Sequence, residues 1–121
     1  MIDKLEEIER RFARLTADLS NPDVLADSTK LTKVAKERSS LEKLVDTFRI
    51  YKKVLEELAG NEELLNGSDA DMKVMAREEL PLLKGRRDEL EAQLKLLLLP
   101  KDPNDEKNVI LEIRSGAGGD E

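Results

Sequence analysis

The glycine-rich end of the chain is the first place where residue types and spacing suggest chemistry. An apolar run over residues 109–114, which predicts a β-strand, leads into Ser115-Gly116-Ala117-Gly118-Gly119-Asp120-Glu121. Glycines after a strand can form a phosphate-binding loop, but this run lacks the Lys-Ser/Thr of a Walker loop and the closing glycine of the dinucleotide fingerprint. Asp120 and Glu121 would also place negative charge where a bound anion should lie. We therefore interpret the run as a tight turn, with both acids in the first turn of a following helix.

Adjacent carboxylates are the second candidate for chemistry. The chain contains the pairs Glu6-Glu7, Glu56-Glu57, Glu62-Glu63, Glu78-Glu79 and Asp88-Glu89. Neighbours on a helix point about 100° apart, so such pairs do not converge on a metal ion or a substrate. The chain also has no cysteine and no histidine, which removes the commonest metal ligands, nucleophiles and general bases. We expect no catalytic, cofactor or metal site, and no enzymatic activity of the chain by itself.

Two charged regions remain as candidate binding surfaces. The segment from Gly60 to Asp71 contains no basic residue, and its acids are Glu62, Glu63, Asp69 and Asp71. These acids could serve solubility and helix capping, or they could form a tip that docks on another protein. Residues 28–60 are basic through Lys30, Lys33, Lys36, Lys43, Lys52 and Lys53. Those lysines could form a solvated face with ion pairs, or a side that faces RNA weakly.

Composition predicts long helices rather than a compact α/β domain. Charged residues make up 40% of the chain and aromatic residues only 2%, with leucine prominent, which is typical of coiled coils. The formal net charge is −6, although residues 28–60 carry eight Lys/Arg and only five Asp/Glu. An acidic chain does not resemble a free-standing nucleic-acid binder. The first residues lack the basic and apolar pattern of a signal peptide, and the longest apolar run, Leu96–Leu99, is too short for a membrane span, so we expect a cytoplasmic protein.

Apolar residues spaced three and four apart predict three helices. The first stripe consists of Ile2, Leu5, Ile8, Phe12, Leu15 and Leu19, and the turn Asn21-Pro22-Asp23 ends it. The second helix should begin at Ser28 as its N-cap and end at Gly60, with Arg38 and Lys52 interrupting its stripe. The third should begin with a capping motif at Ser68 and show a kink or a short break near Leu80, because Pro81 follows. Its stripe consists of Met72, Met75, Leu83, Leu90, Leu94 and Leu97, with both methionines expected to fill gaps in the core.

The simplest fold is all-α: a short helix packed on a long, antiparallel, coiled-coil-like helical hairpin. We expect a helical domain over 1–99, a linker over 100–107, and the first strand and glycine-rich turn of a truncated second domain over 108–121. Phe12 and Phe48 should be buried where the first helix crosses the second. The strand has no neighbour to pair with, so it should fold back on the bundle or pair with a second copy of the chain.

The end of the chain resembles the bacterial class I peptide chain release factors. The resemblance is carried by Leu99-Pro100-Lys101-Asp102-Pro103-Asn104-Asp105, by Asn108 to Arg114, and by Gly116-Ala117-Gly118-Gly119-Asp120-Glu121. Asn21-Pro22-Asp23-Val24 fits as well, and the resemblance extends over the whole chain. The aspartate at position 120 resembles the member of the family that reads UAA and UAG. The related factor that reads UGA usually has threonine at this position. Ser115 departs from the family, where alanine is usual.

The resemblance implies the N-terminal, ribosome-docking domain of a translation termination factor. In this family the domain contacts the ribosomal stalk base, where a ribosomal protein and rRNA meet. The segment that reads the mRNA stop codon and the Gly-Gly-Gln loop that triggers peptidyl-tRNA hydrolysis lie further along the family's chains, so no catalytic residue carries over to this one. Two alternatives remain: a helical-hairpin adaptor or dimerisation module unrelated to translation, and a piece of an enzyme that uses the acid pairs.

Overall fold

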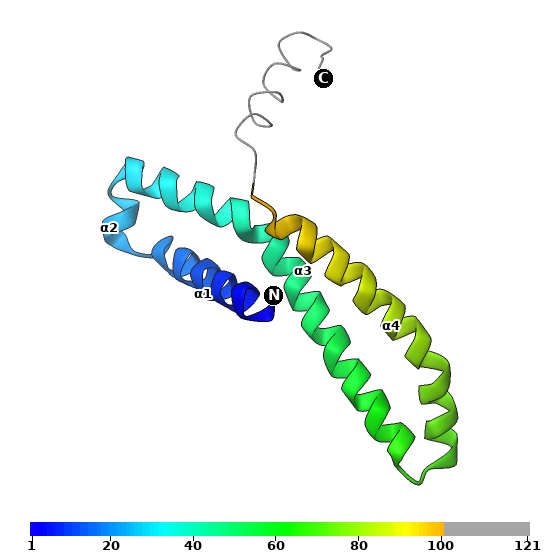
Figure 1. Ribbon diagram of the computed structural model, residues 1–121. Coiled ribbons are helices and arrows are strands. Elements are labelled where there is room, and N and C mark those ends of the chain that lie inside the picture. The colour runs from blue at the N-terminus through cyan, green and yellow to red at the C-terminus, as the bar shows by residue number, and fades with distance from the viewer. Residues whose placement is uncertain (101–121) are drawn as a thin grey trace, which may run out of the picture.

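Residues 1–100 are described by a computed structural model, and they form four helices arranged along one central helix (Figure 1). These helices are α1 (Ile2–Asp18), α2 (Pro22–Leu25), α3 (Ser28–Asn66) and α4 (Ala70–Leu98). With 39 residues, α3 is about 58 Å long. In Figure 1, α1 lies antiparallel along the first half of α3, and α4 returns along the second half. The prediction of a short helix on a long antiparallel hairpin is therefore confirmed.

The predicted second domain lies outside the described residues. The strand over 109–114, the turn that contains Gly116, Gly118, Gly119, Asp120 and Glu121, and the linker beyond Pro100 all belong to that part of the chain. Within residues 1–100 every regular element is a helix. The proposed domain boundaries and the pairing of the strand with another copy therefore stay predictions.

The helices begin one residue away from the predicted caps. Asp27, not Ser28, caps α3, because its carboxylate accepts hydrogen bonds from the N–H groups of Thr29 and Lys30 at 3.0 and 3.2 Å. Asp69, not Ser68, caps α4. Ser and Asp are both good N-caps, so adjacent candidates cannot be separated from the sequence. The expected turn at Pro22 is instead the one-turn helix α2, capped by the Asn21 side chain, which accepts from the Asp23 N–H at 2.9 Å.

The predicted end of the second helix at Gly60 is wrong. α3 continues through Gly60 to Asn66 and is closed by Gly67, whose N–H donates to the Leu64 carbonyl at 3.2 Å. A glycine inside a helix costs about 1 kcal/mol relative to alanine. Beyond Gly60 the helix buries Asn61 and partly buries Leu64 and Leu65. The local preference of one glycine therefore does not end the helix.

α4 contains Pro81 without a break. The helix is continuous from Ala70 to Leu98, so of the two predicted possibilities near Leu80, a kink or a short break, the break does not occur. Figure 1 shows instead that α4 bends near its middle and curves back toward the end of α3. Proline removes one hydrogen bond and crowds the preceding turn, which is the usual cause of a bend. Pro81 itself is exposed.

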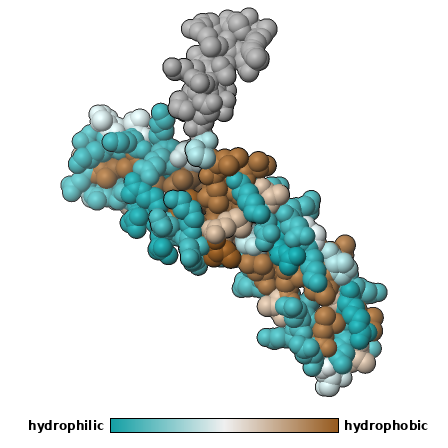
Figure 2. Space-filling model, in the orientation of Figure 1, coloured by the Kyte–Doolittle hydropathy of each residue, from teal (hydrophilic) through white to brown (hydrophobic). Residues whose placement is uncertain are grey.

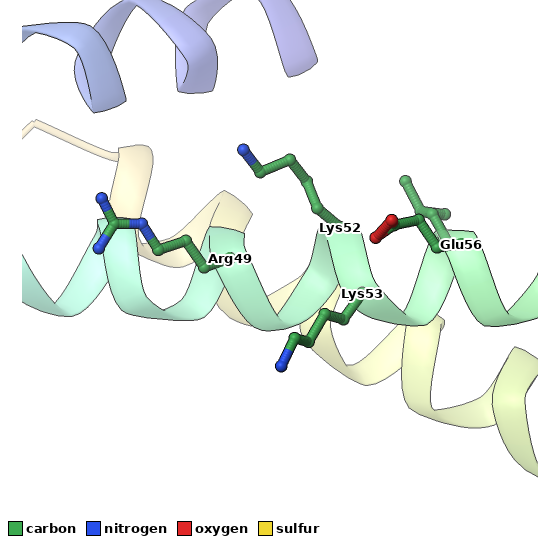
Figure 3. A pocket seen from close by; sticks show the side chains of 5 residues that line it. Arg49, Lys52, Lys53 and Glu56 are labelled. Carbon is green, nitrogen blue, oxygen red and sulfur yellow. The ribbon is translucent and has the colours of Figure 1, made fainter.

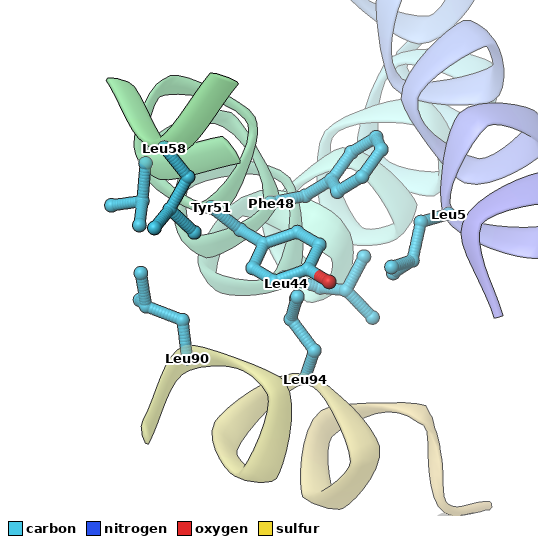
Figure 4. Packing of buried hydrophobic residues seen from close by; sticks show 8 residues of the cluster. Leu5, Leu44, Phe48, Tyr51, Leu58, Leu90 and Leu94 are labelled. Atoms are coloured by element: carbon cyan, nitrogen blue, oxygen red, sulfur yellow. The ribbon is translucent and has the colours of Figure 1, made fainter. Parts of the chain in front are cut away.

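The core lies where α1, α3 and α4 meet (Figure 4). Its main cluster consists of Leu5, Leu44, Phe48, Tyr51, Val54, Leu58, Leu90 and Leu94. Phe48 is 0% exposed and Phe12 5%, which confirms the predicted burial of both phenylalanines. Tyr51 donates a hydrogen bond from its hydroxyl to Glu91 Oε2 at 2.7 Å, which links α3 to α4. Burial, together with this bond, raises the pKa of Tyr51 to about 12.

The buried face of α4 differs from the predicted stripe near the hairpin end. Met72 and Met75 are 37% and 55% exposed, so the prediction that they fill the core is wrong, and Leu97 is also exposed. Ala76 is fully buried in their place. A small side chain lets two helices approach closely, and the longer methionines then lie on the flanks. Figure 2 shows apolar residues at the surface over the middle of the molecule and along α4, where they lie among hydrophilic residues.

Candidate docking surfaces

The pairs of adjacent acids were the candidates for chemistry in the sequence. Their members lie on exposed helix faces. Within residues 1–100, no group of three or more acidic side chains is placed to hold a metal ion. In the same part of the chain no helix is long and apolar enough to cross a membrane.

The acidic tip is the first candidate docking surface, and we define it as Glu62, Glu63, Asp69 and Asp71. The structure brings these four residues together, since the last turn of α3 and the first turn of α4 flank the connection at Gly67 and Ser68. All four side chains are exposed. Asp69 has a local role as well, because its carboxylate accepts a hydrogen bond from the Met72 N–H at 3.2 Å. The other three have no hydrogen bond or ion pair within residues 1–100, so their charges face solvent.

The second surface is the lysine-bearing part of α3, which we call the basic face although its lysines lie on more than one side of the helix, and which we define by Lys30, Lys33, Lys36, Lys43, Lys52 and Lys53. Two shallow depressions lie on it. One of about 470 Å³ is lined by Arg49, Lys52, Lys53, Leu55 and Glu56 (Figure 3). The other, of about 440 Å³, is lined by Ser28, Thr29, Thr32, Lys33 and Lys36. Both depressions are open, as expected for contact with a large partner rather than capture of a small ligand.

α1 neutralises part of this basic face. Glu9 of α1 accepts hydrogen bonds from Lys52 Nζ at 2.7 Å and from Arg49 Nε at 3.1 Å. In Figure 3 Lys53 points away from Lys52, to another side of α3. The expectation of a solvated face with ion pairs therefore holds for Lys52. The other five lysines form no ion pair within residues 1–100.

Sequence reasoning missed the contacts that hold α1 against α3. Arg11 donates to both carboxylate oxygens of Glu37, each at 2.8 Å. The Arg38 guanidinium lies 4.5 Å from the centre of the Phe12 ring, and Lys52 Nζ lies 4.7 Å from that of Phe48. A cation over an aromatic face is attracted by the ring quadrupole. The signal was present in the sequence, since Arg38 and Lys52 are the two residues that interrupt the apolar stripe of α3.

These ion pairs predict a contribution to stability that depends on pH. The hydrogen bond from Lys52 lowers the pKa of Glu9, and the one from Arg11 lowers the pKa of Glu37, both from an ordinary value of 4.5. A carboxylate with a lowered pKa in the folded state stabilises the protein above its ordinary pKa, and this stabilisation is lost as pH falls through the lowered value. The Lys52–Glu9 pair is partly exposed and should contribute at most about 1 kcal/mol.

Thermal unfolding of the double variant Glu9→Gln/Glu37→Gln should reveal this contribution. At neutral pH the variant should be less stable than the parent chain, because it lacks both charged pairs. Below the ordinary glutamate pKa of 4.5 the two melting temperatures should converge. A constant difference between the two chains across the acidic range would show that neither pair contributes to stability.

Comparison with known proteins agrees with the resemblance found in the sequence. A family model described as the PCRF domain matches residues 8–121. Peptide chain release factor 1 of Myxococcus xanthus is 74% identical over 121 residues, which cover 100% of this chain and 33% of that relative. The corresponding proteins of Oleidesulfovibrio alaskensis and Lysinibacillus sphaericus are 51% and 52% identical, with 34% of each relative covered. The chain thus spans about a third of the length of these relatives. No solved structure matches.

Proposed function

This chain belongs to the peptide chain release factors through its PCRF domain, and we propose that its helices dock such a factor on the ribosome during translation termination. The release factors that it matches are about three times as long. Residues 1–100 supply surfaces but no converging catalytic groups. The reading of UAA and UAG, which the resemblance at Asp120 favours, and the hydrolysis of peptidyl-tRNA would then belong to the longer protein.

The observation that carries this proposal is the separation of the two charged surfaces along α3. The acidic tip lies where α3 meets α4, at the end of the hairpin far from α1 (Figure 1). The lysines begin at the other end of the same helix. An acidic tip avoids the phosphates of rRNA and favours a basic protein surface, whereas lysines favour phosphate. We infer that the tip faces a basic ribosomal protein of the stalk base and that the basic face lies nearer to rRNA.

The rival reading, an adaptor unrelated to translation, is disfavoured by the family match. That match includes residues 101–121, for which an adaptor has no need. The reading as a piece of an enzyme is disfavoured because the acid pairs stay apart on exposed helix faces.

Binding without release is the expected behaviour of the isolated chain. Added to ribosomes halted at a stop codon, it should cosediment with them, and it should do so equally well when a sense codon is present. It should release no peptide, because it has no histidine or cysteine to activate a nucleophile and its described acids do not converge. Release by puromycin from the same ribosomes would show that they are competent. Hydrolysis by the chain that depends on the stop codon would contradict the assignment, and failure to cosediment would contradict docking.

A further inference from the structure

Two residues that are unfavourable inside a helix, Gly60 in α3 and Pro81 in α4, lie in the half of the α3–α4 hairpin toward the acidic tip. In α3, Gly60 lies inside the helix, where glycine has the lowest helix propensity of any residue except proline. In α4, Pro81 has no N–H, so the carbonyl of Arg77 one turn earlier lacks its helical donor. Ile50 and Arg86 line one pocket between the helices, and Asn66 and Ala70 flank the connection. Since one step forward along α3 matches one step back along α4, these pairs and the Tyr51–Glu91 hydrogen bond place Gly60 opposite the stretch 76–82 of α4.

The packing between the helices also changes at this level. On the side away from the tip, Leu58 belongs to the main apolar cluster, and Leu80 and Leu83 pack against it. On the side of the tip, over residues 61–79, the only fully buried residues are Asn61 and Ala76. Little apolar surface therefore holds this part of the hairpin together.

Asn61 adds an unfavourable contribution inside that part. It is 5% exposed, and its side-chain Nδ2 has no hydrogen-bond partner within the described part of the chain. A buried donor without an acceptor loses its hydration and gains nothing in return. Opening of the hairpin end would let water reach this amide, so Asn61 favours the open state relative to an apolar residue of the same size.

We propose that the hairpin contains a hinge formed by Gly60 in α3 and by Leu80 and Pro81 in α4. Residues 61–79 open as a unit while the core around Phe48 stays closed. The glycine lowers the free energy needed to bend α3, and the missing hydrogen bond does the same for α4. The sparse packing beyond these positions lowers the free energy needed to separate the two helices. The hinge carries the whole acidic tip, so the direction of these four charges can change without unfolding the domain. This inference concerns the fold and does not depend on what the tip binds.

Amide hydrogen exchange of the 121-residue chain tests the hinge residue by residue. In the parent chain, amides of residues 61–79 should exchange faster than those of α3 around Phe48 and of α4 around Leu90. In Gly60→Ala the amides of residues 61–79 should exchange about fivefold more slowly, the factor that corresponds to about 1 kcal/mol of helix propensity. An added Cβ at Gly60 meets no atom within 4 Å, so this substitution introduces no clash.

Gly85→Ala is the matched control. Gly85 is also an interior glycine of a helix, with no atom within 4 Å of an added Cβ, but it lies outside the proposed moving unit. Gly85→Ala should slow the slowest amides of the core and leave exchange over residues 61–79 unchanged. If both variants slow residues 61–79 equally, or if these amides are as protected as the core in the parent chain, the hinge is refuted.

Asn61→Leu provides a second, independent arm. It removes the unpaired amide and places an apolar side chain of similar size in the same buried position. Exchange over residues 61–79 should slow, as in Gly60→Ala, while the helix content measured by circular dichroism stays the same. Faster exchange in this variant would show that the amide of Asn61 stabilises the closed hairpin, and it would overturn the proposed role of that residue.

Discussion

Replacing Phe48 with alanine should lower the free energy of unfolding by about 3–5 kcal/mol. Phe48 is fully buried and belongs to the one cluster that includes residues of α1, α3 and α4. Figure 4 shows it beside Leu5 of α1 and above Leu94 of α4. Removal of the ring loses its transfer free energy and leaves a cavity that rigid helices cannot fill. It also removes the aromatic face that lies 4.7 Å from Lys52 Nζ. Urea unfolding followed by circular dichroism would measure the loss.

Ile50→Ala is the control for this prediction. Ile50 lies on the same helix, two residues away, but it is 43% exposed. Its truncation should cost much less, because part of the side chain already contacts water and no closed cavity forms. Domains of this size are stable by only about 5–15 kcal/mol, so loss of Phe48 should bring the chain close to unfolding. Equal midpoints for the two variants would show that Phe48 is not the packing centre of the three helices.

Neutralising the acidic tip should slow association with the ribosome by up to about tenfold at low salt. The variant combines Glu62→Gln, Glu63→Gln, Asp69→Asn and Asp71→Asn. Asparagine is as good an N-cap as aspartate, so α4 should still begin at the same residue. Because exposed charges act mainly by steering the encounter, the effect should appear in the association rate and fade as salt is raised. Stopped-flow mixing of fluorescently labelled chain with ribosomes would measure it.

A variant with the same change in net charge separates the tip from overall charge. Glu6, Glu7, Glu78 and Glu79 are exposed and lie outside the tip, and none of them forms an ion pair within residues 1–100. Their replacement by glutamine should leave association unchanged or make it faster, since the chain becomes less acidic. If the two variants have the same association rate, the position of the four tip acids does not affect binding to the ribosome. Faster association of the tip variant would place the tip against RNA.

Much of the fold could be predicted because apolar spacing is a local property that repeats over many residues. The three long helices, the antiparallel hairpin and the burial of Phe12 and Phe48 all depend on such repeats, where one misleading residue has little weight. The errors occurred where a conclusion depended on one residue. Each of these conclusions depended on a local conformational preference of about 1–3 kcal/mol, which the surrounding structure can override. They are the helix end at Gly60, the caps at Ser28 and Ser68, and the helix break at Pro81.

The candidate surfaces divide in the same way. The acidic segment was visible from its residues, and the structure brings its members together because they flank a short connection. The ion pairs of Arg11 with Glu37 and of Lys52 with Glu9 join residues 26 and 43 positions apart, and no spacing rule reaches that far. Arg38 and Lys52 appeared in the sequence only as interruptions of a stripe. Their position over two aromatic rings requires knowledge of how α1 crosses α3.

By itself, the sequence determined that this chain forms long amphipathic helices with an acidic and a basic segment and without the usual catalytic side chains. Those properties follow from composition and short-range periodicity, which do not depend on distant contacts. The tertiary structure decided which residues of α4 are buried, where each helix ends, and that Asn61 and Ala76 are buried near the hairpin end. The physical reason is that burial between two helices is a joint property of both, and its free energy exceeds the preference of any single residue.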